Sequence, residues 1–335
     1  MRLSIIVPAY KVEDYIEKCI RSLEDQDIPQ TDYEIIVTND GSPDQSGTIV
    51  RKLQAKFPNI ILIEQENQGV SMARNNAIAM AKGNYILSID PDDYVLPNTL
   101  QRILTHAESE NLDGFYLGFE IFDGTQKSVW QTNYSELQSQ FLNGVEAYFA
   151  PRGDGVIDPD RSVGILFKKS ILDQYKIHYP KDVPYLEDGL FLAKFFAVAH
   201  RVGFDNERFY QRTTRAGSAT NSTLFYSEKA IQGFIYAIED IKSFGSENEF
   251  HREQKLLINH VVAKFTLLPL TSFISQKSIA NYFNFIKKLK QKNINRISLE
   301  GLRLNYSKMA SIYNSSALLF YIYYPISCKL KNYKK

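Results

Sequence analysis

Three aspartates that follow one short apolar run are the residues of this chain best suited to do chemistry. Residues 85–89 have the length and residue types of a buried strand, and they continue directly into Asp90, Pro91, Asp92 and Asp93. Because burying clustered carboxylates is costly, such a strand is expected to end at solvent or at a cation. Carboxylate oxygens suit a hard divalent ion such as Mg²⁺ or Mn²⁺. Taken alone, the segment is equally well explained as a solvated Asp-Pro turn.

Strands and helices alternate along the part of the chain that must position these aspartates. Short apolar or β-branched runs predict strands, and apolar residues at helical spacing predict amphipathic helices between them. The predicted strands are residues 3–7, 33–37, 60–63, 85–89 and 115–122. The predicted helices are residues 11–26, 48–57, 70–82, which Gly83 closes, and 100–111. This alternation predicts an α/β fold with a mostly parallel, doubly wound sheet.

Other residues with useful side chains follow the first two predicted strands. Pro8, Ala9 and Tyr10 come after the first strand, and Asp40 comes after the second. Because ligands of such sheets bind outside the carboxyl ends of the strands, we expect these residues and the aspartates to gather along one edge. The sequence has no glycine-rich phosphate loop of either usual kind, so a metal and side chains would have to hold phosphates. The convergence favours a nucleotide and metal site over an isolated turn.

Four segments resemble, in the correct order, the motifs of glycosyltransferase family 2, whose members have the GT-A fold. They are SIIVPAYKVEDYIEKCIRSL, EIIVTNDGSPDQS, NQGVSMARNNAIAMAKGNYILSIDPDDYV and YLEDGLF. The resemblance implies a GT-A catalytic domain over residues 1–225 and a helical, basic region over residues 226–335. It further implies a metal-dependent, inverting hexosyltransferase. Such an enzyme moves a sugar from a nucleotide sugar, with UDP favoured, to a hydroxyl of a growing saccharide in capsule, exopolysaccharide or cell-wall glycan assembly.

The resemblance assigns donor binding to residues that follow the strands. Pro8, Ala9 and Tyr10 would form the wall against the nucleotide base, and Asp40 would accept the uracil N3 proton. Arg74, in an Ala-Arg-Asn run, would help to hold the nucleotide and its diphosphate.

The metal site is assigned in the same way to the family's Asp-x-Asp motif. Asp90 and Asp92 are its two acids, with Asp92 as the favoured ligand of Mn²⁺ or Mg²⁺ and Asp90 nearer the ribose or the metal. Asp93 would brace the loop.

Asp188 is the catalytic residue that the resemblance implies. Glu187 and Asp188 precede a predicted helix over residues 190–199 and match the family's Glu-Asp motif, so Asp188 would act as general base. Two acids in the first turn of a helix also favour its dipole without any chemistry. Further along, Arg212 and Arg215 would touch the diphosphate or order a lid, unless they are ordinary surface arginines.

The acceptor side is less clear from the sequence. Many members of the family carry a tryptophan where this chain has Val163 and Gly164, which leaves the acceptor open. One alternative function is a non-catalytic subunit that binds a nucleotide sugar or glycan, although loss of the Asp cluster or of Asp188 would be expected there. A sugar-phosphate nucleotidyltransferase is a second alternative, but it should carry a glycine-rich loop after the first strand.

The composition is that of a globular protein rather than a disordered or integral membrane protein. The chain has 335 residues, of which 44% are hydrophobic and 23% charged. Two cysteines far apart, Cys19 and Cys328, fit a reduced, cytosolic protein, and the N-terminus is too short for a signal-peptide core. Helical patterns fill the C-terminal third, at residues 230–244, 250–273, 279–290 and 306–326.

The basic C-terminal tail predicts attachment to a membrane surface. Residues 280–335 contain eleven Lys and Arg but one acid, a net charge of +10, so the other 279 residues carry −9 of the total of +1. The apolar run 318–326 is too short to span a bilayer, but beside lysines it suits the interface of an anionic cytoplasmic membrane face. A polyprenyl-diphosphate-linked acceptor would be found there. The alternative is that residues 318–326 belong to a helix packed on the rest of the protein. No nucleic-acid-binding module is recognisable in the sequence, so nucleic acid is not an expected partner.

Overall fold

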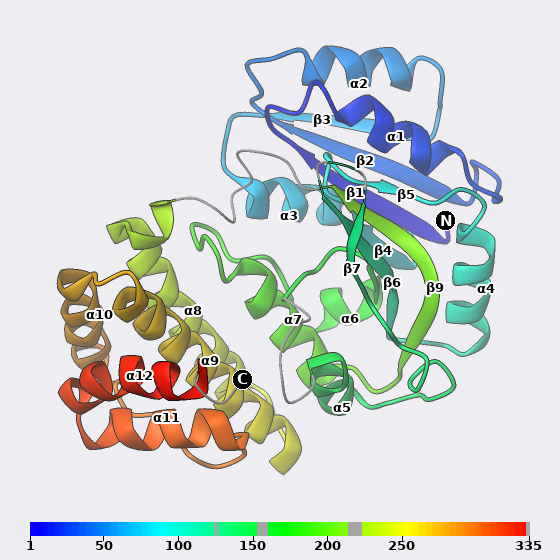
Figure 1. Cartoon of the computed structure of the whole chain (residues 1–335). Coiled ribbons are helices and arrows are strands. Elements are labelled where there is room, and N and C mark those ends of the chain that lie inside the picture. Colours follow the sequence, from blue (N-terminus) through cyan, green and yellow to red (C-terminus); the bar gives the residue numbers. More distant parts are fainter. Residues whose placement is uncertain (124, 126, 153–159, 214–222, 333–335) are drawn as a thin grey trace. The chain divides into compact units, whose positions relative to one another are not determined.

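The computed structural model describes residues 1–123, 125, 127–152, 160–213 and 223–332, and the chain forms two compact units (Figure 1). The first unit comprises Met1–Lys181 and Val198–Ala219, and the second comprises Asp182–Ala197 and Thr220–Lys335. Residues 182–197 thus group with the C-terminal helices, a grouping that the sequence did not predict.

A nine-stranded mixed sheet is the centre of the first unit, with strand order β3-β2-β1-β4-β8-β6-β9-β5 and β7 paired to β6. Its strands are β1 (Leu3–Ala9), β2 (Tyr33–Asp40), β3 (Ile60–Gln65), β4 (Tyr85–Ser88), β5 (Tyr94–Val95), β6 (Gly114–Phe122), β7 (Ser128–Gln131), β8 (Ile165–Lys168) and β9 (Val202–Thr213). Five of these strands were predicted: β1 to β4, which pair in parallel, and β6. Strands β5, β7 and β8 pair antiparallel with their neighbours and were not predicted.

Helices cover both faces of the parallel half of the sheet (Figure 1). The helices of this unit are α1 (Ile16–Glu24), α2 (Ser46–Gln54), α3 (Val70–Met80), α4 (Leu100–Ser109), α5 (Gly144–Phe149) and α6 (Lys169–Gln174). Helices α1 and α2 lie on one face and α3 on the other (Figure 1). Ile16, Ile20 and Leu23 of α1 are fully buried in the same core as alternate β1 residues, as expected for a helix with one apolar face. The predicted doubly wound arrangement is therefore present around β1 to β4.

Strand β1 is longer than predicted, because it runs through Pro8 to Ala9. Ile6 O accepts a hydrogen bond from Ile89 N, and residues two apart on a strand face the same neighbour. The nitrogen of Pro8 therefore points toward β4. The β1–β4 pairing ends at Ser88, which pairs with Ile6, so Pro8 lies past the last paired residues. A proline is tolerated there because no ladder hydrogen bond is lost.

Gly83 does not close α3, contrary to the sequence prediction. The helix ends at Met80, and Gly83 has no left-handed φ of the kind that a glycine cap adopts. Instead its backbone lies against β1, where a Cβ atom would lie 2.4 Å from the carbonyl carbon of Leu3. Glycine is needed at this position for close approach of two backbone segments.

The second unit is helical and is built around its longest helix, α9. Its helices are α7 (Glu187–Val198, the last residue of which belongs to the first unit), α8 (Glu228–Glu247), α9 (Arg252–Ser275), α10 (Ile279–Gln291), α11 (Leu304–Ser315) and α12 (Ala317–Asn332). Among the described residues, α9 alone is long and apolar enough to cross a membrane, but 72% of its most apolar window is buried inside the protein. We interpret α9 as the core helix of this unit.

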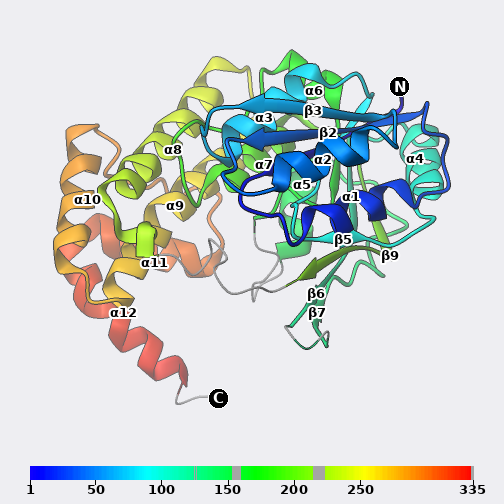
Figure 2. The same ribbon diagram turned by 90° about the horizontal axis from the view of Figure 1, so that it is seen from above.

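The single helix predicted over residues 306–326 is wrong, because Ser316 separates α11 from α12. Ser316 has an extended backbone, with φ −164° and ψ 125°, and its Oγ accepts a hydrogen bond from the Leu319 N–H at 3.3 Å. A serine that caps the next helix in this way ends the helical pattern that the apolar spacing suggested. Figure 2 shows the C-terminal turns of α12 extending past the other helices of this unit.

Candidate active site

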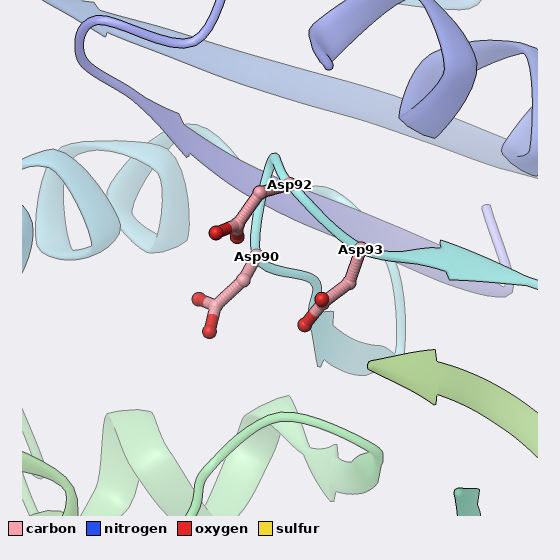
Figure 3. Close-up of side chains that lie close together, drawn as sticks. All are labelled: Asp90, Asp92 and Asp93. Atoms are coloured by element: carbon pink, nitrogen blue, oxygen red, sulfur yellow. The ribbon is translucent and has the colours of Figure 1, made fainter. Parts of the chain in front are cut away.

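The three aspartates lie on one turn between β4 and β5 (Figure 3). One carboxylate oxygen from each of Asp90, Asp92 and Asp93 lies within 4.8 Å of the others. Oxygen ligands of an octahedral Mg²⁺ are about 3 to 4 Å apart, so small side-chain rotations would bring this set to a divalent ion. Asp90 and Asp92 are half-buried, with their carboxylates next to each other on one side of the turn (Figure 3). The donor set therefore fits the predicted Mg²⁺ or Mn²⁺.

Both carboxylate oxygens of Asp93 accept hydrogen bonds from residues of β9. The Tyr210 hydroxyl donates to Oδ2 at 2.6 Å, and the Thr213 N–H donates to Oδ1 at 2.8 Å. Burial, followed by the negative charge of Asp90, raises the pKa of Asp93 to about 8. These contacts support the predicted bracing role of Asp93 and leave Asp90 and Asp92 as the pair for a metal.

Arg74 lies beside the turn and pairs with one of its carboxylates. Its side chain is 5% exposed, and Nη2 lies 2.9 Å from Asp90 Oδ1. The guanidinium also lies over the Tyr179 ring, 5.1 Å from its centroid. Asn75 fixes Tyr179 through two hydrogen bonds, from Asn75 Nδ2 to Tyr179 O and from Tyr179 N to Asn75 Oδ1. The arginine is thus held beside the predicted metal ligands, and its role toward a diphosphate stays a prediction.

Asp40, the last residue of β2, mainly organises the loop that leads into α3. It is 3% exposed. Its Oδ1 accepts hydrogen bonds from the Gln65 side chain and the Gln68 N–H, and its Oδ2 accepts one from the Gly69 N–H. A carboxylate has about four lone-pair positions, so one remains on Oδ2 for a further donor such as the predicted uracil N3–H.

The segment after β1 offers one exposed side chain at the same edge of the sheet. Tyr10 is 42% exposed, whereas Pro8 and Ala9 are buried. Ser42 Oγ accepts a hydrogen bond from the Lys11 N–H at 3.1 Å, which ties this segment to the loop after β2. Tyr10, Asp40 and the aspartate turn therefore all follow neighbouring parallel strands, as the sequence predicts.

The predicted base and the predicted arginines lie elsewhere in the chain. Asp188 is half-buried in the first turn of α7, in the second unit. Tyr185, three residues before it, has φ +74°, a left-handed conformation that is strained for a bulky side chain and is often found at functional sites. Arg212 is the penultimate residue of β9, and Arg215 lies outside the described residues. The roles of Asp188, Arg212 and Arg215 stay predictions.

Tyr179, Tyr210 and Thr213 were missed by the sequence analysis, although each contacts a predicted site residue. Tyr210 and Thr213 are separated from Asp93 by 117 and 120 residues. Tyr210 and Thr213 lie on either side of Arg212, so the prediction of that arginine was the sequence signal for their segment.

A comparison with protein families gives one match that covers half of the chain. The model of glycosyl transferase family 2 matches residues 4–173, which include β1 to β4 and the aspartate turn. The chain is also similar to the poly(ribitol-phosphate) beta-glucosyltransferase of Bacillus spizizenii, with 28% identity over 76% of the chain. It spans 38% of the length of that relative and 60% or less of the length of several others.

Solved structures show the same fold. Residues 1–349 of TarS from Staphylococcus aureus, in complex with UDP-GlcNAc, match 99% of the chain and 92% of that structure, with a TM-score of 0.75 and 20% identity. The mannosyltransferase PcManGT of Pyrobaculum calidifontis, in complex with GDP-Man and Mn²⁺, matches 99% of the chain and 84% of that structure, with a TM-score of 0.53 and 15% identity. The predicted GT-A fold with a helical C-terminal region is confirmed.

Proposed function

Because the chain belongs to glycosyl transferase family 2, we propose that it transfers a sugar from a nucleotide sugar to a hydroxyl of a growing saccharide. The observation that carries this proposal is the Asp90–Asp92 pair with Arg74 beside it, at the carboxyl ends of parallel strands. We favour a UDP-linked donor, since TarS is crystallised with UDP-GlcNAc. The Mn²⁺ in the PcManGT complex supports the proposed cofactor.

The proposed reaction is a direct displacement at the anomeric carbon with inversion. A divalent ion held by Asp90 and Asp92 would supply positive charge to the diphosphate leaving group as a Lewis acid. Arg74 is buried and permanently charged, so it would add to that positive charge and orient the diphosphate. Asp188 would remove the proton of the acceptor hydroxyl as its oxygen attacks from the opposite face. One base is sufficient, because a single displacement needs no enzyme nucleophile.

A test of the donor is a stability screen of the purified chain against UDP- and GDP-sugars with Mn²⁺. A UDP-sugar at 100-fold excess over its Kd is expected to stabilise the folded protein by about 2.7 kcal/mol, seen as a rise in Tm. The stabilisation should disappear when EDTA removes the metal, and slow donor hydrolysis should accompany it. Absence of any shift or hydrolysis with every nucleotide sugar would contradict the proposal.

We further propose that the acceptor is a polyprenyl-diphosphate-linked saccharide and that the protein attaches peripherally to an anionic cytoplasmic membrane face. A stripe on α12 supports this attachment, since its apolar side chains recur at helical spacing and are 42 to 56% exposed. The α12 stripe consists of Leu318, Leu319, Ile322, Tyr323 and Ile326.

The opposite face of α12 packs on its own unit. Phe320 is fully buried, and the ring of Tyr321 stacks with that of Phe283 on α10, their centroids 6.3 Å apart. The helix is thus held by one face while the α12 stripe is left outward. Together with the net charge of +10 in residues 280–335, an outward apolar stripe fits an anionic lipid surface. Packing through one face of α12 is thus compatible with the proposed attachment through the other.

The α12 stripe can be tested by flotation with vesicles of anionic lipid. Replacing Leu318 and Ile322 by aspartate is expected to lower the membrane partition constant by about 100-fold or more, since burying each side chain contributes about 1.5 kcal/mol or more. Val129→Asp is the matched control, because Val129 on β7 is similarly exposed, at 57%. Equal flotation of the double variant and the control would exclude the membrane and favour a second copy or a further domain as the partner of this stripe.

A further inference from the structure

The last residues of β9 contact the aspartate turn at four points. Two of these points are the bonds to Asp93 from Tyr210 and Thr213 described above. The other two reach the backbone of the proposed ligands: the Asp90 N–H donates to the Tyr210 hydroxyl oxygen at 3.1 Å, and the Thr213 hydroxyl donates to the Asp92 carbonyl oxygen at 2.6 Å. Each proposed metal ligand therefore has a main-chain polar group held by one residue of β9.

Both ends of the turn are fixed to the sheet. Strand β4 leads into Asp90, and β5, which follows Asp93, pairs antiparallel with β9 through Tyr94 with Gln211 and Val95 with Tyr210. Between these strands the turn has to hold two half-buried carboxylates side by side against their mutual repulsion. Besides the Arg74–Asp90 ion pair, the hydrogen bonds from β9 oppose this repulsion by fixing the turn backbone.

Tyr210 is itself held rigidly. It is fully buried, and its ring stacks on Phe119 with centroids 4.7 Å apart. The guanidinium of Arg161 lies over the same Phe119 ring, 4.2 Å from its centroid. The Tyr210 hydroxyl donates to Asp93 and accepts from the Asp90 N–H. A buried aromatic stack thus positions a single oxygen between Asp90 and Asp93.

We infer that Tyr210 and Thr213 are positioning residues that set the arrangement of Asp90 and Asp92 and thereby the affinity of the turn for a divalent ion. The inference rests on the proposed metal role of these aspartates. Groups that orient metal ligands change metal affinity without touching the metal, because they remove the need to order the ligands on binding.

The test is a titration of the whole chain with Mn²⁺, in which free Mn²⁺ is followed by electron paramagnetic resonance. Tyr210→Phe and Thr213→Val are each expected to weaken Mn²⁺ binding by about 10- to 100-fold, as removal of ligand-orienting groups typically does. Thr213→Ser keeps the hydroxyl and should bind as the wild type does. At saturating Mn²⁺, the variants should regain the wild-type affinity for UDP, since only metal binding is impaired.

Tyr85→Phe is the matched control, because it removes a buried tyrosine hydroxyl at the other end of β4. That hydroxyl lies 2.9 Å from both the Ala107 and Leu112 carbonyl oxygens, so its loss should lower Tm and leave Mn²⁺ affinity unchanged. Wild-type affinity in Tyr210→Phe and Thr213→Val would overturn the inference, as would equal weakening in Tyr85→Phe. If Tyr210→Phe fails to fold, the comparison of Thr213→Val with Thr213→Ser decides. A wild-type chain that binds no Mn²⁺ would overturn the proposed metal role itself.

Discussion

Replacing Asp188 by asparagine is expected to lower kcat by about 10²- to 10⁴-fold, while binding of the nucleotide sugar stays close to that of the wild type. The amide has nearly the same shape as the carboxylate but cannot take a proton from the acceptor hydroxyl. Because donor binding is assigned to the strand ends of the sheet, a loss confined to kcat is the result that a general base predicts. The measurement is transfer rate at saturating donor, together with UDP affinity.

A control variant at another acid in the first turn of a helix distinguishes a catalytic role of Asp188 from a structural one. Glu228 lies in the first turn of α8 in the same unit, and Lys288 is its ion-pair partner at 2.7 Å. Glu228→Gln removes one helix-terminal charge just as Asp188→Asn does, which is worth about 0.3 to 1 kcal/mol of stability. It should leave kcat unchanged. Transfer by Asp188→Asn within a few-fold of the wild type, with an intact fold, would remove Asp188 as the base.

The parallel half of the fold is predictable because its information is local. Strands β1 to β4 are continuous apolar runs, since both of their faces are covered by helices, and polar residues mark where each strand leaves the core. Strands β5, β7 and β8 have two to four residues each and are defined by antiparallel partners distant in sequence. Segments this short show no hydrophobic periodicity that would identify a strand. Their strand conformation is therefore determined by pairing in the folded protein.

The same distinction between local sequence patterns and distant contacts applies to the residues of the candidate site. Asp90, Asp92 and Arg74 lie in segments with recognisable motifs, and the structure brings all three together. Tyr210 and Thr213 reach the same turn from β9 through two hydrogen bonds each, a relation that no local pattern in the sequence records. Asp40 shows the reverse case, in which a residue with a predicted ligand role is also needed by its own loop.

Replacing Asp92 by asparagine is expected to abolish Mn²⁺-dependent UDP binding and to lower transfer by more than about 10²-fold. A bound divalent ion contributes several kcal/mol to stabilisation of a charged leaving group, and each 1.36 kcal/mol is about tenfold in rate. The amide side chain would keep one oxygen but lose the negative charge that a hard cation requires. UDP titrations with and without Mn²⁺, and transfer rates after EDTA treatment, measure both effects.

The control for Asp92 is an aspartate at the same edge of the sheet that joins the loop after β2 to the segment after β1. Asp44, after β2, accepts hydrogen bonds from the Glu13 and Ser46 N–H groups, so Asp44→Asn should change stability slightly and metal dependence not at all. If the EDTA-treated wild type transferred sugar at its full rate, the Asp90–Asp92 pair would have no metal to hold. Arg74 would then be the neutralising charge for the diphosphate, and Arg74→Lys, which keeps the charge but loses the planar fork, should lower transfer more than Asp92→Asn does. Comparing the two variants therefore distinguishes a metal-centred site from an arginine-centred one.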